Sequence, residues 1–204
     1  MKLINQKEVW NNIAEEWYRF KINPSKHATD FINKSTGNII DFGSGSGRNL
    51  LNLRENKKRE LYLVDFSEKM LKLAKKRSKE LGIEIKTKKS RLEKTNFKDN
   101  FFDAAICTAA IHCIETENKR KLAVKELYRI LKSGAKAEIE VWDRNSKWFK
   151  NKPKEKYISW RDKGKRYYYL YEENEIGNLF KEIGFKIVKF IPDKFNIIFI
   201  VQKP

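Results

Sequence analysis

A glycine at every second position follows a short apolar segment near residue 40. Ile39-Ile40-Asp41-Phe42 reads as a buried strand, and Gly43-Ser44-Gly45-Ser46-Gly47 comes directly after it. Because glycine has no Cβ, such a loop lets backbone N–H groups come close to a nucleotide-like ligand. The spacing differs from the dinucleotide fingerprint G-x-G-x-x-G and lacks the G-K-[ST] of a P-loop, so a pyrophosphate or triphosphate ligand is disfavoured.

A second acidic residue, Asp65, adds the other half of a nucleoside site. Leu61–Asp65 reads as the next buried strand, and Asp65 stands 22 residues beyond Gly43. At that distance an acid lies at the end of the neighbouring strand, where its carboxylate can accept hydrogen bonds from both ribose hydroxyls. Asp41 could instead serve only to cap the loop amides. The sequence predicts a nucleoside site formed by Asp41, Gly43, Ser44, Gly45, Gly47, Asp65 and Phe66.

The rest of the chain supplies alternating helices and strands to position this site. Helical spacing predicts helices over residues 6–21, 25–34, 67–81, 117–131 and 172–183, and a helix starting at Asn49–Leu53. Strand patterns end at Asp41 and Asp65 and also cover residues 83–87, 102–107, 137–142, 185–191 and 195–201, with 83–87 as an exposed edge.

This alternation predicts one α/β domain over residues 1–204. Its sheet is seven-stranded and mostly parallel, with an antiparallel C-terminal hairpin and helices on both faces. We expect the N-terminal helices, within residues 1–35, to cover the nucleoside site. The stretch Met1–Lys7 does not resemble a signal peptide, and no apolar run approaches the length of a membrane span, so we expect a cytoplasmic protein with no membrane contact.

The chain is strongly basic. Lys and Arg number 45 against 27 Asp and Glu, giving a formal net charge of +18. An excess of this size favours a polyanionic partner, because each phosphate contact releases a counterion. A Lys-rich source organism, or the Lys/Glu enrichment of thermophiles, would give the same composition without such a partner.

Part of the basic excess lies in residues 144–171, which follow the fifth predicted strand and fit none of the predicted elements before 172. Lysines, among them Lys152, Lys154 and Lys156, alternate here with Trp148, Phe149, Tyr157 and Trp160. Cations beside aromatic faces are what single-stranded nucleic acid binding needs, for phosphates and for stacked bases. The alternative is a surface insertion whose aromatic rings cover the sheet.

The two cysteines, Cys107 and Cys113, flank an apolar stretch. Two thiols alone cannot form a metal site, and we expect no metal. They are typical of small buried hydrophobic residues in a reducing compartment.

The glycine loop, the two acids and the strands that carry them resemble the class I methyltransferases, whose cosubstrate is S-adenosylmethionine. Further motifs resemble the tRNA wobble-uridine carboxymethyl (5-carboxymethyluridine) O-methyltransferases over nearly the whole chain. The motifs are Val9-Trp10-Asn11-Asn12-Ile13-Ala14, Ala109-Ala110-Ile111-His112, Val141-Trp142, Arg166-Tyr167-Tyr168-Tyr169-Leu170-Tyr171 and Asn196. The glycine loop is common to the superfamily, whereas the aromatic run at 166–171 is the specific part.

The resemblance implies roles for particular residues. Arg91 stands where these enzymes usually carry an Asp that contacts adenine, so the contact would pass to the backbone of Leu92; Cys107 is a further cosubstrate candidate. Around the acceptor, the resemblance implies His112, Arg166, Lys21 and Asn196 as catalytic groups, with Arg166 and Lys21 orienting the substrate. Substrate contacts would come from Trp142, Tyr167, Tyr168, Tyr171, Lys152, Lys154 and Lys156. His112 could equally be a structural histidine.

The implied partners are the tRNA anticodon region and a small zinc-binding activator protein. We expect the activator to pair with an exposed sheet edge, most simply Ile83–Thr87. The departures Lys21 for Arg, Cys113 for His and Ile197-Ile198 for a Trp pair leave the substrate open. Two alternatives therefore stand beside the tRNA enzyme: a methyltransferase of a small carboxylic acid or other metabolite, and a non-catalytic RNA-binding subunit of the same fold.

The implied chemistry needs little from the protein. A carboxymethyl group has a pKa near that of Asp, about 3.9, so the nucleophile is already anionic at neutral pH and needs no general base. Holding the oxygen and the methyl carbon in line at about 3–3.5 Å supplies most of the catalysis by proximity.

Overall fold

The strands of the chain assemble into one central sheet whose order is β3-β2-β1-β4-β5-β9-β8. This computed structural model describes residues 5–204. The first five strands of that order pair in parallel, and β9 pairs antiparallel with both β5 and β8. The predicted seven-stranded sheet with an antiparallel C-terminal hairpin is therefore confirmed. The sheet strands are β1 Gly37–Phe42, β2 Arg59–Asp65, β3 Lys86–Lys89, β4 Phe102–Thr108, β5 Leu131–Trp142, β8 Lys186–Ile191 and β9 Asn196–Gln202.

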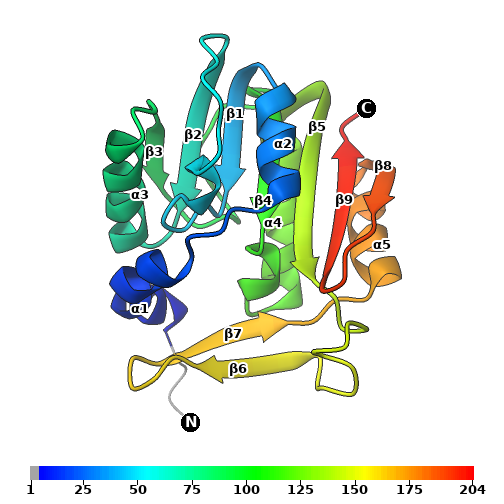
Figure 1. Cartoon of the computed structure of the whole chain (residues 1–204). Coiled ribbons are helices and arrows are strands. Elements are labelled where there is room, and N and C mark those ends of the chain that lie inside the picture. The colour runs from blue at the N-terminus through cyan, green and yellow to red at the C-terminus, as the bar shows by residue number, and fades with distance from the viewer. Residues whose placement is uncertain (1–4) are drawn as a thin grey trace.

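Helices cover both faces of this sheet (Figure 1). They are α1 Gln6–Phe20, α2 Lys26–Lys34, α3 Glu68–Glu80, α4 Glu117–Ile130 and α5 Glu173–Ile183. On one face, α4 and α5 bury residues such as Leu127 and Phe180 against Ile40 and Ile139. On the other face, α2 and α3 pack around Ile39. Successive residues of a strand therefore pack into two separate hydrophobic cores, one on each face of the sheet, because side chains alternate between the two faces along a strand.

Side-chain caps fix where the helices begin. The side chains of Asn5, Ser25, Ser67 and Thr116 each accept a hydrogen bond from a backbone N–H in the first turn of α1, α2, α3 and α4 respectively. Ser67 caps α3 two residues after Asp65, so the acid lies at the junction of strand and helix. This placement brings Asp65 to the carboxyl edge of the parallel strands, where α/β proteins bind ligands.

The structure corrects three element boundaries. The helix expected from Asn49 is only a 3-10 turn, Arg48–Leu50, because Leu51 is extended and Asn52 has a φ of 68°. The edge strand is Lys86–Lys89 rather than 83–87, because Ile83 and Ile85 pack against the core under α2 and α3. The helix expected to reach Leu131 ends at Ile130, and β5 begins at once.

Residues 144–171 contain a second, two-stranded sheet that the sequence pattern did not predict. Its strands are β6 Glu155–Ser159 and β7 Lys165–Tyr169, paired antiparallel. Figure 1 shows this hairpin lying across the carboxyl ends of the central strands, next to α1. The Gln6 side chain joins the two segments: its Nε2 donates to the Lys165 carbonyl at 3.1 Å, and its Oε1 accepts from the Tyr167 N–H at 2.9 Å. Residues 1–4 of the predicted N-terminal region lie outside the described part of the chain.

Candidate functional site

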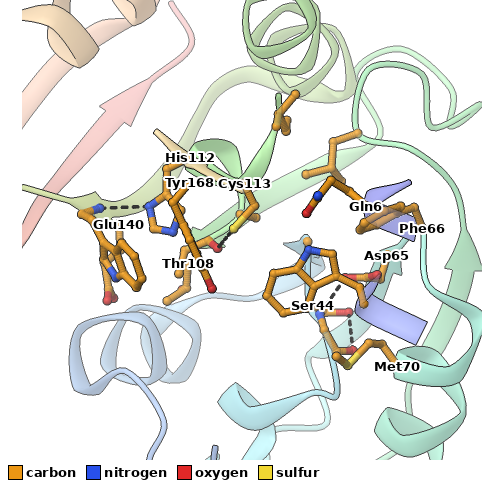
Figure 2. Close-up of a pocket in the computed structure, with 18 of the residues that line it drawn as sticks. Gln6, Ser44, Asp65, Phe66, Met70, Thr108, His112, Cys113, Glu140 and Tyr168 are labelled. Carbon is orange, nitrogen blue, oxygen red and sulfur yellow. Dashed lines mark hydrogen bonds between the residues drawn. The ribbon is translucent and has the colours of Figure 1, made fainter. Parts of the chain in front are cut away.

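A cleft of about 320 Å³ opens at the carboxyl edge of the sheet, and residues of α1 and of the β6–β7 hairpin line it. This volume is within the usual range for small-molecule sites. Figure 2 shows Ser44 and Asp65 on one side of the cleft and His112 and Tyr168 on the other. Twelve residues singled out from the sequence line it, namely Lys21, Gly43, Ser44, Gly45, Asp65, Phe66, Arg91, Leu92, His112, Trp142, Tyr168 and Asn196.

The glycine loop is tied to the neighbouring strand by its own backbone. The N–H groups of Gly43 and Ser44 both donate to the Val64 carbonyl at 3.0 Å. Gly43 has a φ of +91°, and a Cβ added to it would meet the Cβ of Ala110 at 2.3 Å. A side chain at this position is excluded both by the backbone conformation and by the neighbouring loop, so the turn into the cleft requires glycine.

The Asp65 carboxylate lines the cleft and is fixed by two hydrogen bonds from backbone N–H groups. One oxygen accepts from the Gly45 N–H at 2.9 Å and the other from the Ser67 N–H at 2.8 Å. Burial raises the pKa of Asp65 to about 6, although the backbone N–H groups of Ser67, Gly45 and Phe66 favour the ionised form. Each carboxylate oxygen keeps a second acceptor position, so the group can still receive two hydroxyl donors.

Asp41 lies beneath the loop and does not line the cleft. Its Oδ2 is 3.5 Å from the Asn49 Nδ2, and its Oδ1 has no hydrogen-bond partner within residues 5–204. Burial raises the pKa of Asp41 to about 7. The carboxyl does not cap the loop amides, because Gly43 and Ser44 donate to Val64 instead.

His112 is fully buried and is held as a neutral ring. Its Nδ1 accepts a hydrogen bond from the Trp142 backbone N–H at 3.0 Å. The proton must therefore reside on Nε2, which has no partner within the described residues. Burial, together with the nearby Arg48 guanidinium, lowers the pKa of His112 to about 3. The ring can donate one hydrogen bond, but it has no free lone pair with which to accept a proton.

Three cations gather at the end of the cleft near α1. Burial and the neighbouring Arg48 and Arg166 guanidinium groups lower the pKa of Lys21, so both guanidinium groups lie close enough to repel the Lys21 ammonium. None of the three forms an ion pair within residues 5–204. Glu140 also lines the cleft and has a buried oxygen without a partner. This end therefore holds three cations without a direct ion pair, and Glu140 is the nearby carboxyl that opposes the lowering of the Lys21 pKa.

A stack of aromatic rings forms one wall of the same end. Trp142 lies between Phe149, at 4.8 Å and 26°, and Tyr168, at 4.2 Å and 22°. The Tyr168 hydroxyl accepts from Arg166 Nη1 at 2.6 Å. Arg166 also lies over the rings of Trp17 and Trp160, at 5.2 and 4.8 Å. Arg166 therefore lies next to the cleft without lining it. Its guanidinium contacts two rings that do line the cleft, those of Tyr168 and Trp17.

The structure does not bring all predicted site residues to the cleft. Gly47 turns away from it, since a Cβ there would meet Ala74 of α3 at 3.1 Å. Cys107 is fully buried in the core on the α4 side. The alternation along β7 sends Tyr167 to the side opposite Arg166 and Tyr168, where its hydroxyl accepts from Arg120 at 3.2 Å. Tyr171 belongs to the main hydrophobic core.

The three predicted substrate lysines also lie outside the cleft. Lys154 Nζ pairs with Glu175 at 3.0 Å. Lys156 Nζ lies 5.5 Å from the Phe149 ring centre, and Lys152 is exposed. Two of the three are therefore occupied by contacts within the fold.

Sequence reasoning missed several residues that line the cleft. Trp10 belongs to a motif that carries the family resemblance, and Arg48 directly follows the glycine loop, but the sequence assigns neither residue a role. Trp148 and Phe149, predicted as part of the nucleic-acid-binding segment, also line the cleft. Phe195 directly precedes Asn196, a signal that could have identified it. The missed residues include Gln6, Trp17, Arg48, Met70, Glu93, Thr108, Glu140 and Phe195.

No group of three or more His, Cys, Asp or Glu side chains suited to a metal ion occurs among residues 5–204. Across the same residues, no helix combines the length and the apolar character needed to cross a membrane. Cys107 and Cys113 are both free thiols, the first buried and the second partly exposed.

The chain is similar to known methyltransferases. A family model described as a methyltransferase domain matches residues 40–139. The chain is 30% identical over 149 residues to the tRNA (carboxymethyluridine(34)-5-O)-methyltransferase alkbh8 of Xenopus tropicalis, an overlap of 72% of this chain and 22% of that protein. It is 38% identical over 102 residues to the ubiquinone/menaquinone biosynthesis C-methyltransferase UbiE of Rickettsia prowazekii, covering 47% of this chain and 40% of that protein. The chain thus spans less than half the length of both relatives.

Solved structures share the whole fold at low identity. A methyltransferase of Methanosarcina mazei described as S-adenosylmethionine-dependent superposes with a TM-score of 0.74 at 18% identity, covering 89% of this chain and 99% of that one. A methyltransferase of Haloferax volcanii, solved in complex with the Trm112 methyltransferase activator, superposes with a TM-score of 0.72 at 16% identity, covering 98% and 96% of the two chains.

Proposed function

The chain belongs to the S-adenosylmethionine-dependent methyltransferases of class I fold, and we propose that it methylates the carboxylate of 5-carboxymethyluridine at the wobble position of tRNA. The product is a methyl ester. The oxygen of the acceptor carboxylate attacks the methyl carbon, and S-adenosylhomocysteine leaves.

The residues of the cleft fit the cosubstrate. Asp65 would accept from the ribose hydroxyls, and the loop at Gly43–Gly45 brings backbone close to the ligand, with open space where a Cβ of Gly45 would stand. Arg91, Leu92 and Glu93 line the region beyond β3 where the adenine would lie. S-adenosylmethionine supplies a methyl group on a sulfonium centre, which needs no further activation by the protein.

The observation that carries the choice of acceptor is the locked tautomer of His112. The Trp142 N–H occupies the Nδ1 lone pair, so this histidine can donate a hydrogen bond but cannot serve as a general base. An acceptor that is already anionic needs no base, and a carboxylate meets this condition at neutral pH. Lys21 and Arg48 form no direct ion pair within residues 5–204, so both cations can still contact such an anion, although the Glu140 carboxylate lies near Lys21.

In this reaction the protein's residues orient the acceptor. Lys21 would steer the carboxylate, and the Nε2–H of His112 would donate to it. Arg166 is a positioning residue, because its hydrogen bond holds the Tyr168 ring against Trp142. A cation clamped on the carboxylate stabilises the ground state more than the transition state, so orientation in line with the methyl group matters more than charge.

Two partners follow from this proposal. The net charge of +18 suits a tRNA substrate, and its anticodon would approach the open end of the cleft. A zinc-binding activator would pair with the outer edge of β3, which ends the sheet order. The Haloferax methyltransferase, which has the same fold, was solved with such an activator.

A second candidate is favoured by Glu140. This carboxyl lines the cleft with one buried oxygen unpaired, so it could remove a proton from a neutral acceptor. The likeness to a C-methyltransferase agrees with this possibility. The second candidate is therefore methylation of a small metabolite with Glu140 as the base.

A labelled-methyl assay separates the two candidates. Purified protein, alone and with a small zinc-binding activator, is given labelled S-adenosylmethionine and either tRNA bearing 5-carboxymethyluridine or a set of small acids and quinols. Transfer to the modified tRNA, retained in Glu140→Gln, supports the tRNA function. Transfer only to small acceptors, lost in Glu140→Gln, supports the second candidate.

A further inference from the structure

A second aromatic stack stands at the rim of the cleft, separate from the Phe149–Trp142–Tyr168 wall. The rings of Trp148 and Phe195 lie 4.0 Å apart at 24°. Both residues line the cleft, and Trp148 is 60% exposed. A ligand that enters the cleft would therefore meet an open aromatic face at its rim.

The other aromatic residues of the 144–171 segment are already engaged. Trp160 packs on Trp17 and donates to Glu16 at 2.7 Å. Phe149 is buried on Trp142, and Tyr157, though 49% exposed, does not line the cleft. Within residues 5–204, Trp148 is therefore the aromatic residue of this segment that offers an open face at the cleft.

The rim stack is held in place before any ligand binds. Asp193 Oδ1 accepts from the N–H groups of Phe195 and Asn196 at 2.9 and 2.8 Å, and the Asp143 N–H donates to the Phe195 carbonyl at 3.1 Å. On the Trp148 side, Ser146 anchors a turn through bonds from Phe149 and Lys150. Two distant loops thus meet in a fixed geometry, which reduces the ordering cost of binding.

The surroundings favour a planar group on an anionic chain. Lys147 Nζ lies 5.8 Å from the Phe195 ring centre, and Lys147 has no ion-pair partner in the described part of the chain. Aromatic faces beside a free lysine fit an unpaired nucleobase and its phosphate. They fit a small acid or a folded protein surface less well.

We propose that the Trp148–Phe195 stack binds the nucleobase next to the one being methylated. This inference rests on the proposed tRNA function and adds a second recognition site to it. The methylated nucleotide enters the cleft, and its neighbour stacks on the exposed face of Trp148. One base stacked on an aromatic ring strengthens binding about 5- to 150-fold.

The test compares two acceptors that differ only in having neighbouring nucleotides: 5-carboxymethyluridine as the free nucleoside, and an anticodon stem-loop carrying the same base. Trp148→Ala should raise KM for the stem-loop at least fivefold more than KM for the nucleoside. Trp148→Phe should restore most of the loss because it keeps a ring face. Phe190→Ala, which removes a partly exposed ring of β8 outside the cleft, should behave like the parent chain with both acceptors.

A binding measurement gives a readout that does not depend on turnover. Trp148→Ala should weaken binding of the fluorescent stem-loop at least fivefold while the variant stays folded at the assay temperature, because the side chain is mostly exposed. Equal losses on nucleoside and stem-loop, or no loss on the stem-loop, would overturn this inference and leave the proposed function intact. Failure of the parent chain to methylate either acceptor would instead overturn the proposed function, and the inference with it.

Discussion

The backbone N–H of Trp142 donates a hydrogen bond to Nδ1 of His112 at 3.0 Å, and this contact decides what the histidine can do. It joins the end of β5 to the loop after β4 and fixes the ring tautomer. A buried histidine with its proton on Nε2 is a hydrogen-bond donor to the cleft at every pH where the protein is folded and the ring neutral.

The depressed pKa of His112 gives a pH-dependent stability. In the unfolded chain the imidazole protonates below about 6.5, whereas in the folded chain it stays neutral down to about 3. Its stabilising contribution is therefore present above pH 6.5 and is lost as the pH falls toward 3. Asp41 and Asp65, whose pKa values are raised, act in the opposite direction, so their contribution is lost as the pH rises through about 6 to 7.

Comparing the parent protein with His112→Gln isolates the contribution of His112 to the pH dependence of the free energy of unfolding. Urea unfolding at pH 7.5 and pH 5.0 should show that the parent loses about 2 kcal/mol more stability over this interval than the variant. Equal losses in both proteins would mean that the histidine titrates normally.

Cosubstrate binding should weaken at low pH because of Asp65. Ribose hydroxyls donate to the ionised carboxylate, whose pKa is about 6 in the free protein. Below that pH, protonation competes with binding, so the Kd for S-adenosylhomocysteine should rise toward tenfold per pH unit. Calorimetry on Asp65→Asn should give a Kd at least tenfold weaker and nearly independent of pH; a sloping profile in that variant would assign the titration to another group.

Gly43 should tolerate no side chain. Gly43→Ala should lower the free energy of unfolding by about 2 kcal/mol or more, because a φ of +91° and the Ala110 Cβ at 2.3 Å both oppose the new methyl group. Gly134→Ala is the matched control: its φ is +79° with open space around it, so about 1 kcal/mol of backbone strain is expected. Equal losses would show that the contact with Ala110 relaxes freely.

The lysines of the 144–171 segment should differ in their effect on tRNA binding. Lys154 pairs with Glu175, so Lys154→Ala should leave the salt dependence of tRNA binding unchanged and cost about 0.5 kcal/mol of stability. Lys152 is exposed, and Lys152→Ala should reduce the slope of log K against log salt by about 0.7–0.9. The reverse pattern would mean that the ion pair opens to bind phosphate.

The glycine loop, Asp65 and the central sheet could be predicted because residues close together in the sequence determine them. The loop at Gly43–Gly47 and Asp65 are recognisable because positive φ values and strand ends impose residue types at fixed spacing. The sheet follows from the alternation of periods along the chain. These features depend on neighbours in sequence and need no knowledge of distant contacts.

The end of the cleft proposed to bind the methyl acceptor was harder to predict, because residues that are far apart in the sequence form it. The run Arg166-Tyr167-Tyr168 was recognised, but which of its members face the cleft depends on β7 pairing with β6 and on Gln6 from α1. Arg48 and Lys21 meet only through the fold, as do Trp148 and Phe195. No period or spacing in the sequence encodes these meetings.

The central claim, methyl transfer to a tRNA carboxylate, is tested most directly by the chemical form of the product. The protein, with and without an activator, is incubated with labelled S-adenosylmethionine and tRNA carrying 5-carboxymethyluridine, and the nucleosides are separated before and after mild alkali. A methyl ester predicts label on the modified uridine that is released as methanol by alkali, and no label on tRNA lacking the carboxymethyl group. Label that resists alkali, label on unmodified tRNA, or transfer only to small acceptors would contradict the account.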